Sequence, residues 1–279
     1  MRILSEHACF GGVQRFLAHD STECRGEMRL AVYEPPQARH GRVPVLYYLS
    51  GLTCTEETFT IKAGAQRLAA ERGLLLVAPD TSPRVRLPGD DAGWDFGLGA
   101  GFYVDATEEP WSAHYRMYSY VTRELPALLK AEFVAADTSR QSVMGHSMGG
   151  HGALVCALRN PGQYRSVSAF APIVAPSQVP WGHKAFGNYL GANRGDWLAY
   201  DATHLVQRAP RTDTILIDQG LGDKFLAEQL RPELFEDACA RSGQQLQLRR
   251  HADYDHGYYF IQTFMADHIA WHARALAIA

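Results

Sequence analysis

The stretch G-H-S-M-G at residues 145–149 constrains this chain most, because it places a serine between two glycines. An apolar run at 140–147 precedes it with the pattern of a strand, and the apolar residues 148–160 follow with the pattern of a helix. A tight strand-to-helix turn would lift the serine above a sheet, where side chains at the glycine positions would collide with their neighbours. The pattern predicts that Ser147 is a nucleophile. The alternative is a serine that only caps a helix N-terminus.

The rest of the chain alternates between strand and helix patterns. Further strands are expected at 31–36, 43–51, 74–80, 164–174, 213–220 and 245–252. Further helices are expected at 63–73, where Gly73 is a C-terminal cap, and at 118–133, 231–243 and 259–276. This order predicts an open, mostly parallel α/β sheet with helices on both faces. The stretches 81–117 and 175–212 are expected to be long functional loops, with short helices within them as the alternative.

Composition limits the possible partners and compartments. The 279 residues are 46% hydrophobic and carry a net charge of −3 with mixed signs, which favours a single domain over 1–279 and a small-molecule partner rather than nucleic acid. No apolar run approaches the roughly 18 residues that span a membrane, and the N-terminus lacks a signal-peptide pattern. Five scattered cysteines predict neither a disulfide framework nor a zinc site. We therefore expect a cytoplasmic protein that needs no metal or other cofactor.

A serine nucleophile needs a histidine base and an acid that orients it. In α/β-hydrolases these residues follow the serine in the order acid, then histidine. His256 lies in "DYDHGYYF", between the last predicted strand and the terminal helix, which is the expected position of the base. His256 is therefore the predicted base for Ser147.

Other histidines have structural interpretations. His268 and His272 are four residues apart on the terminal helix and, without a further ligand nearby, are expected on a solvated face. His146 adjoins the serine but is expected to point away from it. His151 is one turn into the following helix, where it packs or lines the pocket wall.

The acid should follow the strand at 213–220. Asp218 is within that strand and Asp223 lies in the glycine-containing loop after it. The loop gives Asp223 room to reach His256, so Asp223 is preferred and Asp218 remains the alternative. Asp253 and Asp255 are too close to His256 in sequence and are expected to structure its loop.

An oxyanion needs two backbone donors. One is expected from Met148, the residue after the nucleophile, and the other from the loop after an early strand. The segment "YYLSGLTCT" at 47–55 is such a strand and loop, and Gly51 permits the turn. The N–H of Leu52 is the candidate donor.

The assembled pattern resembles the S-formylglutathione hydrolase (esterase D) family from about residue 49 to 269. The stretches that carry the resemblance are "LSGLTCTEETF", "LVAPDTSPR", "WDFGLGAGFYVDAT", "YRMYSYVTRELP", "GHSMGGHGAL", "SAFAPI", "PWGHKAFGNYLG", "YDATHLV", "ILIDQG" and "YDHGYYFIQTFMADHI". The resemblance implies an α/β-hydrolase fold, a cytosolic homodimer and hydrolysis of S-formylglutathione to glutathione and formate. It places the triad on Ser147, Asp223 and His256, the oxyanion donors on Leu52 and Met148, and a thiol sensitive to reagents on Cys54.

Substrate range depends on segments that depart from this resemblance, at 84–93, 174–179 and 221–223. Bulky aromatic residues are expected to close the acyl pocket to long chains, and the alternative for each is core packing; they are Trp94, Phe96, Phe102, Tyr103 and Trp181. A broad carboxylesterase or acyltransferase with the same triad is the second interpretation. A binding protein without chemistry has no need of the complete Ser, Asp and His set.

Overall fold

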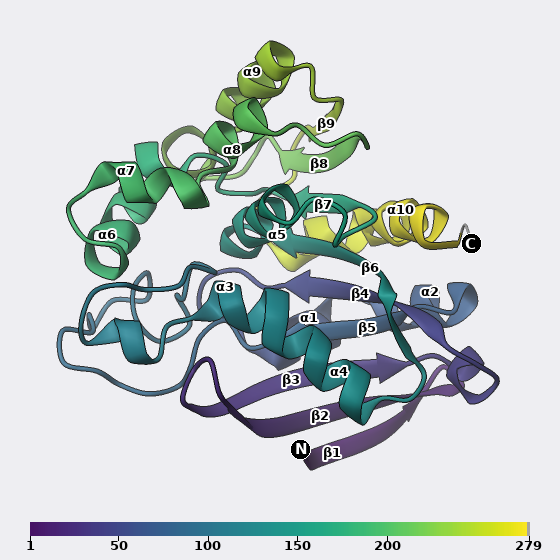
Figure 1. Cartoon of the computed structure of the whole chain (residues 1–279). Helices are drawn as coiled ribbons and strands as arrows, with labels where there is room; N and C mark the ends of the chain where they lie inside the picture. The colour runs from purple at the N-terminus through teal and green to yellow at the C-terminus, as the bar shows by residue number, and fades with distance from the viewer. Residues whose placement is uncertain (278–279) are drawn as a thin grey trace.

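Nine strands form one sheet in the computed structural model, which describes residues 1–277 (Figure 1). The order across the sheet is β1-β2-β3-β5-β4-β6-β7-β8-β9. The strands are β1 Arg2–Cys9, β2 Gly12–Ser21, β3 Gly26–Glu34, β4 Val43–Leu49, β5 Leu75–Pro79, β6 Ala136–His146, β7 Val167–Phe170, β8 Ile215–Gly220 and β9 Leu246–His251. Strands β4 to β9 run parallel, while β1, β2 and β3 form an antiparallel extension at one edge. The predicted α/β sheet is confirmed.

Helices cover both faces of this sheet, with α4 and α5 in front in Figure 1 and α2 and α10 packed together behind. The helices are α1 Glu56–Lys62, α2 Ala65–Arg72, α3 Met117–Ser119, α4 Leu125–Glu132, α5 Met148–Arg159, α6 Pro180–Tyr189, α7 Arg194–Trp197, α8 Ala202–Arg208, α9 Pro232–Ser242 and α10 Tyr258–Ala277. Gly73 follows α2 with φ +68°, which confirms the predicted cap.

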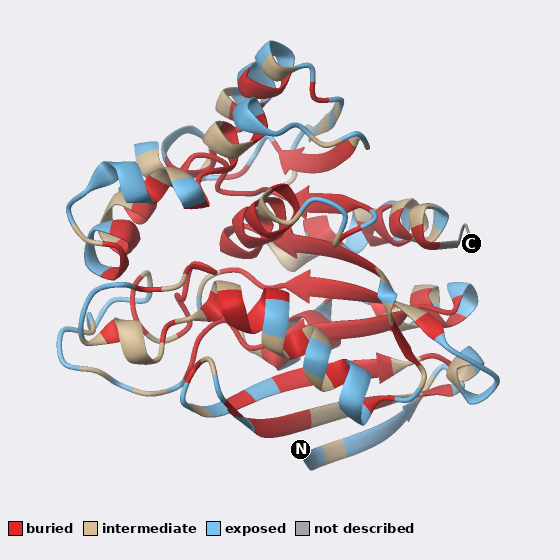
Figure 2. Ribbon diagram, viewed as in Figure 1, coloured by how far each residue is buried: buried red, intermediate tan, exposed pale blue. Residues whose placement is uncertain are grey.

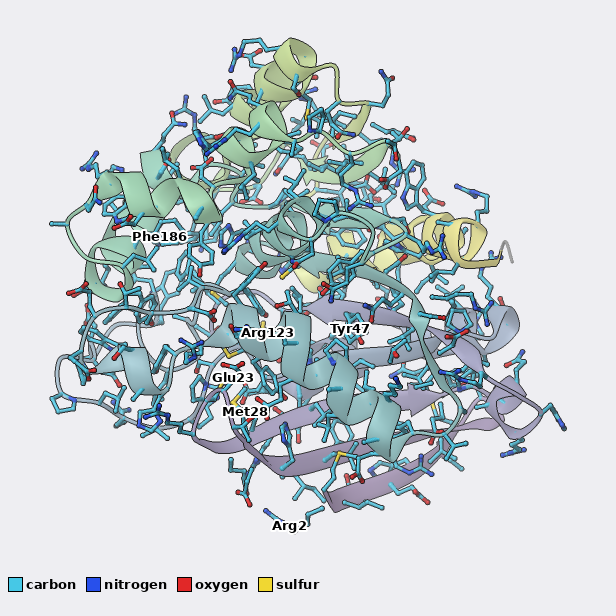
Figure 3. All side chains as sticks on the ribbon, viewed as in Figure 1. Arg2, Glu23, Met28, Tyr47, Arg123 and Phe186 are labelled. Atoms are coloured by element: carbon cyan, nitrogen blue, oxygen red, sulfur yellow. The ribbon has the colours of Figure 1, made fainter. Side chains whose placement is uncertain are left out.

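Burial explains why the inner strands of the sheet are rich in apolar residues. Every residue of β5 and of β8 is buried, as Figure 2 shows for the middle of the sheet. Strands covered on both faces need side chains that can leave water in both directions. One polar group in this core is paired across two strands: the Tyr47 hydroxyl, labelled in Figure 3, donates to Gln141 Oε1 over 3.0 Å.

The helix predicted at 118–133 is present but interrupted. It consists of α3, one π-helical turn at Tyr120–Glu124, and α4. Pro126 is the cause, because it has no N–H to donate to the preceding turn. Gln163 Nε2 instead donates to the Thr122 carbonyl over 2.8 Å, which satisfies the acceptor that the proline leaves open.

Two parts of the fold were not predicted. The N-terminal hairpin of β1 and β2 showed no clear alternation, and β1 is mostly exposed at the sheet edge. The stretch 175–212, expected to be a long loop, contains α6, α7 and α8. Phe186 of α6, also labelled in Figure 3, packs against Phe102 and against His151 of α5.

The prediction for His268 and His272 was wrong, because both side chains are fully buried against the sheet. His272 is hydrogen-bonded to Ser166 and Ser168 over 2.8 and 2.7 Å, and His268 to Ser168 over 2.8 Å. Burial lowers the pKa of each imidazole, and His268 further lowers that of His272. These histidines join α10 to β7 rather than facing solvent.

Candidate active site

Ser147 occupies the strained turn that its sequence pattern predicts. It lies between β6 and α5 with φ +58° and ψ −119°, a region that side-chain-bearing residues rarely adopt. A Cβ atom on Gly145 would overlap the Gly149 carbonyl, and one on Gly149 would overlap the carbonyl of Leu49 in β4. The two glycines therefore allow β6, α5 and β4 to meet at this point.

The helix-cap interpretation of Ser147 finds no support. Within residues 1–277 its side chain makes no capping hydrogen bond at α5. Its backbone is held instead, because its N–H donates to the Phe170 carbonyl over 2.9 Å and its carbonyl accepts from His151 N over 2.9 Å. The Ser147 hydroxyl is therefore available for a role other than capping α5.

His256 and Asp223 form a close pair beside the sheet edge. The Nδ1 of His256 donates to Asp223 Oδ2 over 2.5 Å. Asp223 is 5% exposed, and its other oxygen accepts from the Phe225 N–H over 2.8 Å, which fixes the carboxylate. The structure thus brings together the preferred acid and the predicted base across 33 residues of sequence.

Asp218, the alternative acid, is committed elsewhere. Arg249 donates to both of its oxygens over 2.6 and 2.5 Å, and His268 Nε2 lies 3.3 Å away. Burial alone would raise the pKa of Asp218, but the hydrogen bonds from His268 and Arg249 outweigh it and lower the pKa to about 2. The charge of this carboxylate is thus compensated by Arg249, and its role is structural.

The ring of His256 is packed from two sides. His146 lies 4.4 Å away between ring centroids and Phe225 lies 5.1 Å away. Burial, followed by the nearby His256, holds the pKa of His146 well below its usual range, so His146 is a neutral packing partner. Asp255 accepts from the Gly257 N–H over 2.8 Å, in agreement with its predicted role in the loop.

The loop after β4 passes directly beside the nucleophile. A Cβ atom on Gly51 would lie 3.2 Å from Ser147 Cβ. Thr53, with φ +69°, donates its N–H to the Gly99 carbonyl over 2.9 Å. The Leu52 N–H has no backbone acceptor among the described residues, and Met148 is the first residue of α5, where N–H groups lack helical partners.

Cys54 is half-buried in the same loop. Its N–H donates to the Gly51 carbonyl over 3.3 Å, and its carbonyl accepts from Thr81 and Arg84 over 2.6 and 2.9 Å. Burial raises the pKa of the Cys54 thiol, which keeps it protonated at neutral pH.

The aromatic residues predicted for the acyl pocket separate into two groups. Trp94 is 52% exposed, and its ring centroid lies 5.4 Å from that of Trp181. The ring of Trp181 lies 4.7 Å from that of Phe225, which packs against His256. These rings form a row that leads to His256. Phe225 was not singled out from the sequence, although its position two residues after Asp223 was a signal. The remaining three are fully buried in the core, which favours packing: Phe96, Phe102 and Tyr103.

Among residues 1–277, no group of three or more His, Cys, Asp or Glu side chains has the arrangement to hold a metal ion. None of the helices in the described part of the chain combines the length and apolarity needed to cross a membrane.

A parallel α/β sheet with a strained serine at its strand–helix turn, beside a His–Asp pair, defines a serine hydrolase of the α/β-hydrolase class. The esterase family model, described as "Putative esterase", matches residues 21–272. The S-formylglutathione hydrolases of Mus musculus and Rattus norvegicus are 56% and 54% identical, with 99% of each chain covered. The chain therefore belongs to the S-formylglutathione hydrolase family.

Solved structures agree with this assignment. An S-formylglutathione hydrolase from Agrobacterium tumefaciens is 54% identical, with a TM-score of 0.96 over 99% of this chain and 100% of that one. The serine hydrolase FphF of Staphylococcus aureus, 19% identical, has a TM-score of 0.75 over 94% of this chain and 98% of its own. The second likeness concerns the fold alone.

Proposed function

We propose that this enzyme hydrolyses S-formylglutathione to glutathione and formate, with Ser147, His256 and Asp223 as its triad. The observation that carries the proposal is the 2.5 Å hydrogen bond between His256 and Asp223 beside the strained Ser147. We infer the substrate from the relatives that are named S-formylglutathione hydrolase.

In the first half of the reaction, Ser147 Oγ attacks the formyl carbon while His256 takes its proton. Asp223 holds the imidazole in position and stabilises its charged form. The N–H groups of Leu52 and Met148 donate to the oxyanion. The carbon–sulfur bond then breaks, and its electron pair leaves on the glutathione sulfur, which takes the proton from His256.

In the second half, a water molecule replaces glutathione. His256 accepts a proton from this water as its oxygen attacks the formyl carbon of the ester on Ser147. The bond to Ser147 Oγ breaks, the serine recovers its proton from His256, and formic acid leaves and releases its remaining proton to water as formate. The chemistry of these steps requires no metal or organic cofactor.

The row of rings gives the acyl pocket a wall. We place Trp94 and Trp181 at the substrate, where together with Phe225 they restrict the space next to His256. Lys184 supports this arrangement, since its Nζ lies 2.6 Å from both Asp91 and Asp95 on the segment that carries Trp94. Cys54, in the loop after β4 that carries Leu52, is the thiol at which a bulky reagent would block the site.

The wider organisation follows the same resemblance. A single domain over 1–279 is supported by one continuous sheet and one hydrophobic core cluster. A cytoplasmic location is supported by the five cysteines, which form no disulfide in the described chain. A homodimer is supported by the unpaired edge strand β1, where Ile3 and the following Phe10 expose large apolar side chains.

The test is kcat/KM for S-formylglutathione beside that for an aryl acetate, on one preparation. We expect a preference for the thioester of several orders of magnitude. Similar values, or a preference for the acetate, would contradict the proposed substrate and favour the second candidate, a broad short-chain carboxylesterase on the same triad.

A further inference from the structure

His146 is a second imidazole at the candidate active site, and no step of the mechanism uses it. It is the last residue of β6 and directly precedes the nucleophile. Its side chain is buried, and neither Nδ1 nor Nε2 has a hydrogen-bond partner within residues 1–277. A neutral imidazole carries one donor and one acceptor, so two polar groups are left unsatisfied in a buried place. Such groups are rare in native proteins and call for a specific explanation.

The ring of His146 lies against several parts of the site. Its centroid is 4.4 Å from that of His256, with 46° between the two ring planes. Its Nδ1 lies beside the loop after β4, because a Cβ atom on Gly51 would be 3.2 Å from it. Tyr258, the first residue of α10, has its ring centroid 6.1 Å away. His146 is therefore placed between the base, the loop that carries Leu52 and the nucleophile turn.

The backbone of His256 offers an acceptor to this ring. Burial and then the His256 side chain lower the pKa of His146, whereas a contact with the His256 backbone raises it. Only an acceptor favours the charged form of an imidazole, so the group in contact is the His256 carbonyl. In the free enzyme this contact lies outside hydrogen-bond geometry. Hydrogen bonds at catalytic groups are often long or misaligned before the substrate binds, and they tighten in the transition state.

The two neighbouring imidazoles differ in their ability to hold a proton. Two like charges this close would repel each other, so a charge on both is disfavoured. His256 has Asp223 as a partner over 2.5 Å, and its side chain is 17% exposed. His146 has no carboxylate partner within the described chain, and its burial keeps it neutral. The proton of Ser147 therefore goes to His256, and the N–H of His146 remains available for the carbonyl.

We propose that His146 is a positioning residue, which holds His256 in place for Ser147 by ring contact and by donating its N–H to the His256 carbonyl during turnover. The donor that is unsatisfied in the free enzyme then has its partner while the base acts. Asp223 differs in role, because it holds Nδ1 of the His256 ring rather than the backbone. This inference rests on the proposed triad and is independent of the proposed substrate.

The test uses three replacements of His146 that separate its ring from its nitrogens. His146→Phe keeps an aromatic ring and removes both nitrogens, whereas His146→Asn and His146→Gln place an amide N–H near Nδ1 or Nε2. With an aryl acetate as substrate, His146→Phe should lower kcat about 10- to 100-fold, because a small displacement of the base is enough for such a loss. KM should change by less than about twofold, because substrate contacts remain. At least one amide variant should recover most of the lost kcat.

A spectroscopic measurement reports on the base itself. The proton shared by His256 and Asp223 in their short hydrogen bond gives a far-downfield NMR signal. This signal should shift or broaden in His146→Phe and return in the amide variant that recovers activity. His272→Phe is the matched control, because it also replaces a fully buried imidazole, one that is hydrogen-bonded to Ser166 instead. It should lower the stability and leave both kcat and the signal unchanged.

The outcomes for the triad and for His146 can be distinguished. Unchanged kcat and NMR signal in a folded His146→Phe would overturn the proposal, as would a loss that neither amide variant reduces. Should His146→Phe fail to fold, His146→Leu replaces it, with a loss of kcat at least as large expected. Activity retained in His256→Gln would contradict the triad itself. An inactive His256→Gln beside a fully active His146→Phe would contradict this inference alone.

Discussion

The chain contains two clusters of Ser, His and Asp, and only one of them has the features of a catalytic site. In one, His256 donates to Asp223 over 2.5 Å beside Ser147. In the other, Ser168 is 2.8 Å from His268 Nδ1, and His268 Nε2 is 3.3 Å from Asp218. Both places therefore contain the same three residue types, with a histidine close to an aspartate in each.

The surroundings separate the two clusters. Ser168 lies within the regular strand β7, whereas Ser147 has φ +58° on a turn. The charge of Asp218 is compensated by the guanidinium of Arg249, whereas the carboxylate of Asp223 is held by the backbone N–H of Phe225. A catalytic triad thus requires a serine held outside regular structure and an acid whose charge remains for the histidine.

Replacing each serine should separate the clusters most strongly. Ser147→Ala should lower kcat by about 10⁴- to 10⁶-fold with little change in Tm, because it removes the nucleophile. Ser168→Ala should instead lower the free energy of unfolding by about 1–3 kcal/mol, since it leaves two buried histidines short of a partner. Steady-state kinetics and urea unfolding measure both. Retained activity in Ser147→Ala would remove it as nucleophile.

The two acids should differ in the same direction. Asp223→Asn should lower kcat by about 10⁴-fold, because the imidazole loses the partner that sets its tautomer. Asp218→Asn should lower the free energy of unfolding by about 3 kcal/mol or more, since Arg249 and His268 lose their shared anion. A larger kinetic effect from Asp218→Asn than from Asp223→Asn would reverse the assignment.

Acid should destabilise the chain through its buried imidazoles. Unfolded histidine titrates near pH 6.5, and burial lowers the pKa of His146, His268 and His272 in the folded state. Below pH 6.5 the unfolded chain therefore binds more protons, and stability falls as the pH falls. We expect a loss of up to about 2 kcal/mol for each histidine still neutral at pH 5.

Urea unfolding at pH 7.5 and pH 5 measures this loss. The depressed pKa of Asp218 does not contribute here, because its stabilisation is lost only as the pH falls from about 4 towards 2. His272→Gln removes one buried imidazole and should reduce the difference between the two pH values. An unchanged difference would show that these histidines do not control acid stability.

The smallest effect is expected at the rim of the catalytic cluster. Trp94→Ala should raise kcat/KM for an aryl butyrate relative to the acetate by a few-fold to about tenfold, because it opens one wall of the acyl pocket. Stability should change by less than about 1 kcal/mol at a residue that is 52% exposed. An unchanged ratio of the two esters would place Trp94 outside the acyl pocket.

The sequence could have supplied one feature that our interpretation missed. On α10, Ile261, Met265, His268, His272 and Leu276 follow one another at helical spacing and share a buried face. This period indicates burial of both histidines, whereas the lack of a further ligand nearby led to the prediction of a solvated face. Their serine partner on the sheet could not be predicted from the sequence, because those contacts join residues about 100 positions apart.

Local rules, by contrast, were enough for the nucleophile turn. The glycines around Ser147 are required by collisions with immediate neighbours, and a strand followed by a helix can be read from adjacent residues. The alternation of these elements also predicted the parallel part of the sheet. Sequence by itself thus determined the fold class and the candidate nucleophile, because both depend on short-range sterics and periodicity. The order of its partners came from the rule for α/β-hydrolases.

Tertiary structure decided what each polar side chain meets. Only the packing of β8, β9 and α10 assigned Arg249 to Asp218 and left Asp223 for His256. Only the meeting of α1 with β3 and β5 buried Glu56 near Asp80. These outcomes depend on distances between residues remote in sequence, and the free energy of a buried charge depends on every neighbour rather than on its own position in the chain.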